Sequence, residues 1–551
     1  MSEDKYTNKM KTYRDILKWG DKREEKLDSG MIKVLKQKLN ISDTDFAGKY
    51  LPGNDEIIIE KEIQIPDNII QKFIEISGQE NVSLKNEDRA SHSFGKSYPE
   101  LLKLRLSKIE NPPDLVLYPK STDDVVQIVK ICNEENIAII PFGGGSSVTL
   151  ALKARKGGLS LDLTRHMNQV LNVSEVNHSV KVQAGMYGPA FEKYLNGYSN
   201  GYTCGHFPQS FEYSTVGGWI AARGAGTYST GYGKIEEMVL ALKIVSPSGI
   251  IETKDYPADA EAWDLNHIFI GSEGVLGVIV EATLKIRKYQ PDNATYASFL
   301  FKDFESAVNT MRQTMQAGYG KPHLFRISDP EETDVAFKVK GFEGTLSDWF
   351  LKLKGYKPAK RTLMFVVIEG DKDYARFVKN KIKKTAKKNS GFYIGGSPTK
   401  KWLEQRYSSA YARDPLMDLG IITDTLETAV TWENLIPLWS EIRAYLDKRS
   451  LTTAMVHLSH VYENGANLYV TFLSPMKRGD ELEDYYAVHK GLMDTIIQNK
   501  GSISHHHGVG RVLAPWMKQQ SNEVELGLYQ ATKDSLDPKG IMNPGGMFGL
   551  K

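Results

Sequence analysis

Three glycine-rich segments between residues 141 and 279 constrain the fold of this chain more than any other feature. They are PFGGGSSV (141–148), PQSFEYSTVGGWIAARGAGTYSTGYG (208–233) and GSEGVLGVI (271–279). Glycine gives the backbone access to positive φ and lets peptide N–H groups approach a ligand closely. The first loop alone fits a ligand site or a tight turn, since it lacks both the P-loop lysine and the G-x-G-x-x-G spacing. Together the three loops predict a backbone-lined groove for an extended dinucleotide with flat rings.

Composition excludes several other classes of protein. The 551 residues carry a net charge of +2, so no global field attracts a polyanion and we expect no nucleic-acid partner. Only Cys132 and Cys204 are present, which excludes a disulfide framework and a cysteine-based metal site. No apolar run reaches the ~18 residues of a membrane span, and neither terminus shows a secretory or SKL-type signal. We expect a cytoplasmic protein, peroxisomal only if its source is eukaryotic.

Hydrophobic periodicity divides the chain into four parts. From Asp114, a strand (DLVLYP), a helix capped at Ser121 and a buried strand at 137–140 predict a β-α-β unit that ends in the first glycine loop. Later strands and helices alternate as they would on a separate α+β sheet. The predicted parts are a helical N-terminal region (1–113), the domain with the glycine loops (114–288), a second domain (289–500) and a C-terminal tail (501–551).

The glycine loops and the terminal DPKGIMNPG resemble the vanillyl-alcohol-oxidase-type flavoproteins. That resemblance implies an α+β fold, in which a two-subdomain, PCMH-type FAD-binding domain is covered by an α+β cap and the tail returns to the flavin. It also implies noncovalently bound FAD. The implied FAD-binding residues are Pro141, Phe142, Gly143, Gly144, Gly145, Ser146, Ser147, Pro208, Gln209, Ser210, Phe211, Glu212, Tyr213, Ser214, Thr215, Gly218, Ala221, Ala222, Arg223, Gly224, Glu273, Gly274, Val275, Leu276, Gly277, Val278 and Ile279.

Further motifs resemble one family within that superfamily, the alkyldihydroxyacetonephosphate synthases. They are KWG (18–20), EDRASHSFGKSYPELLKLR (87–105), NPPDLVLYP (111–119), YARD (411–414) and SHHHGVG (504–510). Such transferases exchange the acyl group of acyl-dihydroxyacetone phosphate for a long-chain fatty alcohol in ether lipid biosynthesis. Their FAD acts as a covalent scaffold without net oxidation. The resemblance implies these two substrates, and we expect a homodimer.

The same resemblance makes Tyr469, His505, His506 and His507 the catalytic proton-transfer residues. Without it, a strand tyrosine is usually core, and a histidine triplet is a polar turn. An extended backbone would place His505 and His507 on one side and His506 on the other. A free phenol has a pKa near ~10, so we expect the histidines and an arginine to lower the pKa of Tyr469.

Two arginines are candidates for the substrate phosphate. Arg413 takes this role by resemblance, and its planar fork suits a dianion, although it could simply pair with Asp414. Arg326 is a second candidate, with a structural ion pair as its alternative.

Several alternatives stay open. A 2-hydroxy-acid dehydrogenase or oxidase, acting on D-lactate or glycolate, would share every flavin loop, but the stretch HVYENGANLYVTF (460–472) lacks the Asp and the second His of that family's metal motif. We expect no metal, the alternative being one held by His457, His460 and the triplet. A catalytically silent flavin-binding scaffold is a third class.

The lysine-rich segment 371–389 has an apolar stripe at Tyr374, Phe377, Val378 and Ile382. It is either a solvated helix face or a contact with an anionic membrane surface.

Overall fold

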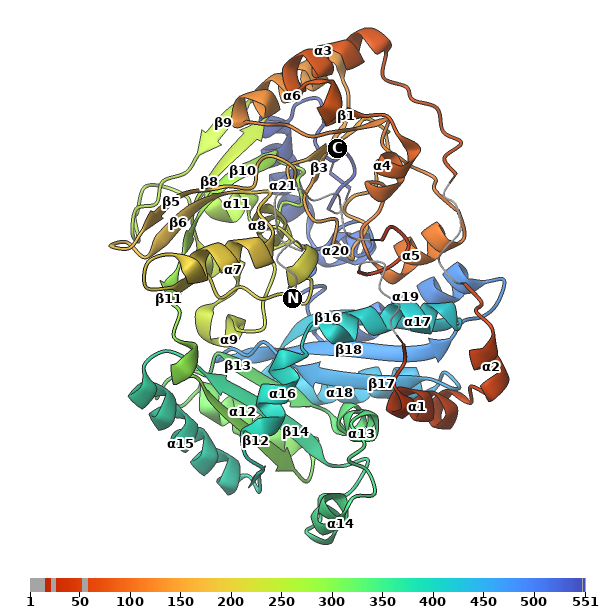
Figure 1. Cartoon of the computed structure of the whole chain (residues 1–551), viewed down its shortest axis with the longest axis vertical. Helices are drawn as coiled ribbons and strands as arrows, with labels where there is room; N and C mark the ends of the chain where they lie inside the picture. Colours follow the sequence, from red (N-terminus) through yellow and green to blue (C-terminus); the bar gives the residue numbers. More distant parts are fainter. Residues whose placement is uncertain (1–14, 21–25, 52–57, 548, 551) are drawn as a thin grey trace.

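A computed structural model describes residues 15–20, 26–51, 58–547 and 549–550, and it has two main parts (Figure 1). The upper part in Figure 1 holds two larger sheets and one short two-stranded sheet, and the lower part is built on a single large sheet. The segment of the chain before Asp114 contributes to both parts. Within the described residues, no helix is both long enough and apolar enough to cross a membrane.

The first upper sheet has four strands in the order β1-β2-β4-β3, and β2, β4 and β3 run parallel. Its elements are α3 (Asp67–Ser77), β1 (Val82–Ser83), β2 (Leu115–Leu117), α6 (Thr122–Glu135), β3 (Ile139–Phe142) and β4 (Leu159–Asp162). The hydroxyl of Ser121 accepts from the peptide N–H of Asp124 and begins α6, which buries Val125, Ile128, Val129 and Cys132. The predicted β-α-β unit is therefore present, and β3 leads directly into the first glycine loop.

The second upper sheet is antiparallel, in the order β5-β6-β10-β8-β9. Its strands are β5 (Val170–Ser174), β6 (Ser179–Gln183), β8 (Val239–Ser246), β9 (Gly249–Glu252) and β10 (Val278–Lys285). The elements around it are α7 (Gly188–Gly197), β7 (Tyr202–Thr203), α8 (Val216–Ala221), α9 (Ser229–Tyr232), α10 (Ile235–Met238), α11 (Asn266–Phe269) and β11 (Arg287–Lys288). The third glycine loop lies immediately before β10, so the two upper sheets flank the loops.

The lower sheet has seven strands, β15-β12-β14-β13-β17-β18-β16, all paired antiparallel. Its strands are β12 (Thr295–Phe301), β13 (Leu324–Ser328), β14 (Thr362–Ile368), β15 (Phe392–Tyr393), β16 (Ile421–Thr431), β17 (Thr453–Leu458) and β18 (Gly465–Pro475). Its helices are α12 (Phe304–Met315), α13 (Pro330–Val339), α14 (Leu346–Leu353), α15 (Lys372–Lys388), α16 (Ser397–Glu404), α17 (Arg413–Asp418), α18 (Trp432–Asp447) and α19 (Glu481–Gln498).

Both faces of this sheet are covered, which is why β14 is buried at every position. Alternate residues of a strand point to opposite faces. Met364, Val366 and Ile368 join the large core with α12, α15, α18 and α19, whereas Leu363, Phe365 and Val367 join a smaller core that Trp402 of α16 contacts.

The N-terminal region is less uniformly helical than the sequence suggests. Its helices are α1 (Ser29–Leu39), α2 (Asp43–Ala47), α3, α4 (Asn86–Ser91) and α5 (Tyr98–Arg105), and non-helical segments separate them. Val34, Leu35 and Leu39 of α1 pack on the lower part with Val335, whereas β1 pairs with β2 of the upper sheet. Residues 1–14 lie outside the described part of the chain.

The tail carries α20 (Ala514–Gln520) and α21 (Glu523–Leu536) and then returns to the first glycine loop. The peptide groups of Ile541 and Asn543 bond to Ile139 of β3. Lys533, whose side chain is fully buried, donates to the carbonyls of Val275 and Met542 and pairs with Asp537. One buried ammonium thus joins the tail to the third glycine loop.

Lys533→Ala should lower the free energy of unfolding by ~3–5 kcal/mol, because Asp537 would stay buried without its partner. Urea unfolding measures the loss. The matched control is Lys490→Ala, which removes an exposed pair with Asp494 at the same i,i+4 spacing. It should cost under ~0.5 kcal/mol. Equal losses in the two variants would contradict the role given to Lys533.

Candidate active site

Three polar side chains form a row across the lower sheet. Glu427 of β16 lies opposite Tyr469 of β18, which lies opposite His457 of β17. Their neighbours along each strand, such as Leu426, Leu468 and Val456, belong to the large core. Because alternate residues face opposite ways, the row faces away from that core.

The loop that follows α19 brings the histidine triplet onto this row. The rings of Tyr469 and His457 stack with centroids 4.7 Å apart, and those of Tyr469 and His507 lie 5.7 Å apart. His506 lies 6.0 Å from Tyr469, and His505 stacks on His460 at 5.2 Å. The structure therefore brings the four predicted catalytic residues together.

The predicted alternation of the triplet is wrong. Residues 505–507 bend instead of extending, and consecutive rings contact each other at 5.1 and 4.5 Å. The Nδ1 atoms of His505 and His506 lie 2.9 Å apart. The cause is a buried carboxylate around which the backbone turns.

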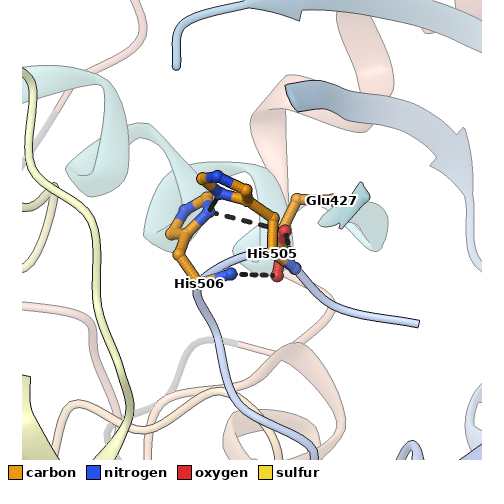
Figure 2. A group of neighbouring side chains, drawn as sticks. All are labelled: Glu427, His505 and His506. Atoms are coloured by element: carbon orange, nitrogen blue, oxygen red, sulfur yellow. Dashed lines mark hydrogen bonds and ion pairs between the residues drawn. The ribbon is translucent and has the colours of Figure 1, made fainter. Parts of the chain in front are cut away.

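That carboxylate belongs to Glu427, which sequence reasoning missed (Figure 2). It accepts from the peptide N–H groups of His505, His506 and His507 at 2.6, 3.1 and 3.0 Å, and from the hydroxyl of Ser504 at 2.6 Å. Burial alone would raise the pKa of Glu427, but the histidines, His506 first, hold it well below its ordinary value. The available signal was an acid in the middle of a strand-like stretch, between Leu426 and Val430.

A second buried carboxylate holds the same loop from the other domain. Glu273, in the third glycine loop, accepts from the peptide N–H of Val509 at 2.7 Å and of Gly510 at 2.9 and 3.0 Å. Burial raises the pKa of Glu273 to about 7. The side chain of this predicted FAD-binding residue thus orients the histidine loop.

The expected lowering of the Tyr469 pKa is also wrong. Desolvation raises the pKa of Tyr469 and outweighs the hydrogen bond to Thr425 and the charge of Arg413. Burial likewise lowers the pKa of His457 and of His507 to about 4, and that of His505 well below 6.5. These histidines are neutral at pH 7 and supply no positive charge to the phenol.

The structure places the two candidate arginines differently. Arg413 is near enough to Tyr469 and His507 to influence both pKa values, and it binds the carbonyl oxygen of Lys96 and the carboxylate of Asp424. It does not pair with Asp414, whose carboxylate accepts the peptide N–H of Trp19.

Arg326 reaches the row of side chains only through another residue. It pairs with Glu332, whose other oxygen lies 3.3 Å from Nδ1 of His457. Burial alone would raise the pKa of Glu332, but Arg326 and His457 lower this pKa to about 2. Arg326 therefore connects through Glu332 to the ring that stacks on Tyr469.

Lys96 is a second residue that sequence reasoning did not single out, although it lies in the 87–105 motif. Its ammonium donates to the carbonyls of Asp15, Ile16 and Lys18 at 2.7, 2.9 and 2.7 Å, and its peptide N–H donates to Ser147 of the first glycine loop. One lysine thus joins the N-terminal segment, a glycine loop and Arg413.

The glycine loops meet as an FAD groove requires. A Cβ on Gly144 would lie 1.8 Å from the carbonyl oxygen of Tyr213, so only glycine allows the first two loops to approach. Gly274, at φ +76°, packs against Pro141 and brings in the third loop. Both ring nitrogens of the fully buried His206, beside Trp219, lack a hydrogen-bond partner within the described residues. Buried ring nitrogens without partners, beside loops that only glycine allows to approach, fit a bound dinucleotide.

Four side chains of the second loop join the two domains. Gln209 donates to the carbonyl of Arg406, Phe211 stacks on Tyr407, and Glu212 and Tyr213 bond to the hydroxyl of Tyr411. These four side chains of the predicted FAD-binding segment contact the cap. We therefore expect this part of the segment to contact the cofactor through its backbone.

Glu427, His505 and His506 have the residue types of a metal site, with ligand atoms within 4.8 Å of one another. This carboxylate already accepts four hydrogen bonds, three at Oε1 and one at Oε2. The geometry therefore describes a hydrogen-bonded cluster better than a set of free ligands.

Comparisons with known proteins agree with this architecture. Residues 113–254 match the "FAD binding domain" family model, and residues 290–547 match "FAD linked oxidases, C-terminal domain". The alkyldihydroxyacetonephosphate synthase of Dictyostelium discoideum is 34% identical over 83% of this chain and 76% of its own. A solved structure of an alkyldihydroxyacetonephosphate synthase superposes with a TM-score of 0.81 and 29% identity, covering 94% of this chain and 92% of that one. The glycolate oxidase subunit of Bacillus subtilis is 25% identical over 88% of this chain and 97% of its own.

Glu427→Gln should destabilise the protein by ~2–4 kcal/mol at pH 7, because an amide NH₂ group would meet peptide N–H donors. The folded-state pKa of Glu427 is depressed, so its stabilisation is present above pH 4.5 and is lost as the pH falls further toward that pKa. Urea unfolding between pH 3 and 7 should therefore show a flatter acid limb in the variant. The exposed Glu433→Gln is the control, and an unchanged acid limb in Glu427→Gln would contradict the assignment.

Proposed function

The chain belongs to the alkyldihydroxyacetonephosphate synthase family, and on that premise we propose that it exchanges the acyl chain of acyl-dihydroxyacetone phosphate for a long-chain fatty alcohol. The bond from C1 of the dihydroxyacetone unit to the acyloxy oxygen breaks, and a bond from C1 to the alcohol oxygen forms. A fatty acid leaves, and the net reaction involves no oxidation.

The observation that carries the proposal is that a loop held by both domains brings the histidine triplet next to Tyr469 of β18 and near Arg413 of α17. We assign FAD binding to 114–288, the cap to 289–500 and the return to the flavin to 501–551. When bound, FAD supplies an electron-rich ring system that allows the exchange at C1. The chain's own residues bind the phosphate and move protons.

Tyr469 enters the reaction as an acid. Its raised pKa keeps the phenol protonated at neutral pH, so it donates first, to the departing carboxylate. The neutral rings of His505 and His507 are proton acceptors. His505 also bonds to the hydroxyl of Tyr462 at 2.6 Å, which continues the proton path beyond the triplet.

Arg413 binds the substrate phosphate in this proposal. Its side chain is 11% exposed and is fixed by the carbonyl of Lys96 and by Asp424, so its orientation is set before the substrate arrives. Its charge next to Tyr469 then places the phosphate near the proton donor. Arg326, the second candidate for the phosphate, supports the site through Glu332 and His457.

The test is an anaerobic visible spectrum of the FAD-loaded protein. We expect D-lactate and glycolate to leave the flavin absorption unchanged. Acyl-dihydroxyacetone phosphate should alter it, and a fatty alcohol should restore it. Bleaching by a 2-hydroxy acid would instead identify a dehydrogenase or oxidase and refute the proposal.

Tyr469→Phe should reduce the alkyl exchange rate by ~10²-fold or more while FAD stays bound, because the phenol proton is lost and the ring remains. Exchange is measured with radiolabelled fatty alcohol, and bound FAD by absorbance. Tyr356→Phe, a cap tyrosine whose hydroxyl bonds to the carbonyl of Ser390, is the control and should retain full activity. Exchange at the wild-type rate in Tyr469→Phe would remove this residue from the mechanism.

A further inference from the structure

Residues 15–20, called here the N-terminal loop, form a closed turn that is packed into the molecule. The peptide N–H of Asp15 donates to the carbonyl of Gly20 at 2.7 Å, and the peptide N–H of Leu17 donates to the carboxylate of Asp15 at 2.8 Å. Leu17 and Trp19 are only 6 and 7% exposed. The proposed proton transfers do not involve this loop, so its burial needs another explanation.

Two buried cations hold the N-terminal loop by its backbone. Lys96 binds three of the four consecutive carbonyls of residues 15–18, and Nε of Arg105 donates to the fourth, that of Leu17, at 3.1 Å. The side chains of Lys96 and Arg105 are themselves buried. Because every carbonyl of this stretch has a fixed donor, the course of the backbone is set up to Trp19.

The ring of Trp19 lies beside Arg413. It packs with Tyr213 of the second glycine loop and Tyr411 of the cap. The guanidinium carbon of Arg413 lies 5.9 Å from the centroid of the Trp19 ring, within the range of a cation–π contact. Such a contact is stronger where water is excluded, as it is here. Arg413 is thus oriented by an aromatic ring as well as by its two hydrogen-bonded partners.

The peptide N–H of Trp19 also determines which acids surround Arg413. It donates to both carboxylate oxygens of Asp414, at 3.0 and 3.1 Å. Among the residues that the structure describes, the acid within 4 Å of Arg413 is Asp424, which also accepts the hydroxyl of Tyr485 at 2.6 Å. With Asp414 held by the loop and Asp424 shared, the charge of Arg413 is only partly neutralised, as a phosphate ligand requires.

The fit of the N-terminal loop against the cap is close. A Cβ on Gly20 would lie 2.2 Å from the ring of Tyr411, whose hydroxyl is bonded to Glu212 and Tyr213. Only glycine therefore allows the loop to approach, and any larger residue would displace Trp19 from Arg413.

We propose that Trp19 is a positioning residue of the active site, which sets the orientation and the available charge of Arg413 for the phosphate of the substrate. The inference rests on the proposed function, in which Arg413 binds that phosphate. Trp19 touches no reacting atom and acts through Arg413. A loop that only joined the domains would need neither a ring beside this cation nor a hydrogen bond to the acid next to it.

The test is calorimetric binding of dihydroxyacetone phosphate to the FAD-loaded, full-length protein, which requires no turnover. Trp19→Ala should bind about tenfold more weakly, because the cation–π contact and the packing are lost. Trp19→Phe keeps an aromatic face and should restore most of the affinity. The matched control is Trp439→Ala, which removes a ring 5.8 Å from Arg443 on the core side of the cap and should bind as the wild type does.

A second variant, Gly20→Ala, displaces the loop without removing any group that contacts Arg413. It should weaken binding of dihydroxyacetone phosphate by a similar factor. Its control is Gly527→Ala in α21, where a Cβ would meet nothing within 4 Å, and which should leave the affinity unchanged.

Exchange kinetics separate positioning from a structural role. In Trp19→Ala, KM for acyl-dihydroxyacetone phosphate should rise about tenfold, while kcat stays within about twofold and KM for the fatty alcohol is unchanged. A wild type that binds no dihydroxyacetone phosphate would overturn the inference, and so would wild-type affinity in both loop variants. Loss of FAD, or an equal rise of both KM values, would show a structural role and would overturn it too. A wild type that binds dihydroxyacetone phosphate but exchanges nothing would refute the proposed function and leave the role of Trp19 standing.

Discussion

The site depends on two buried carboxylates that bind one loop from opposite sides. Glu427 of the cap accepts the peptide N–H groups of residues 505–507, and Glu273 of the flavin domain accepts those of 509 and 510. Five peptide donors on one short loop thus require acceptors from both domains. The histidine rings take their positions only when the two domains are in their native arrangement, which couples the geometry of the site to the domain interface.

Burial controls the charges in this site more than proximity does. Arg413 and several histidines surround Tyr469, and adding their charges would predict an acidic phenol. Desolvation instead keeps the phenol protonated and the rings of His457, His505 and His507 neutral. The resting site therefore presents one protonated phenol and several unprotonated rings beside the Glu427 carboxylate and the Arg413 cation.

Local features of the chain could be predicted from its sequence, and long-range pairings could not. The β2-α6-β3 unit could be predicted from the helix cap at Ser121 and from the strand and helix patterns of apolar residues around it. The glycine loops could be predicted from their clustered glycines. The membership of Tyr469 and the triplet in one site rested on resemblance to a family. Glu427 and Lys96 were missed because their roles depend on partners far away in sequence. The bend at 505–507 was missed for the same reason, since an extended backbone is the default only where no buried acceptor redirects it.

Two amphipathic helices of the cap, α14 and α15, show the same limit in a different way. The stripe of α15 looked like a surface feature, yet Val378 and Ile382 are fully buried while Tyr374 and Phe377 lie at the edge of the helix. The stripe of α14 has the same helical spacing and is exposed at Leu346, Trp349, Phe350 and Leu353. Periodicity determines which residues share a face, but the tertiary contacts determine the direction in which that face points. In α14 the buried ion pair of Asp348 and Arg361 fixes the orientation of the helix, so that its apolar side faces the solvent.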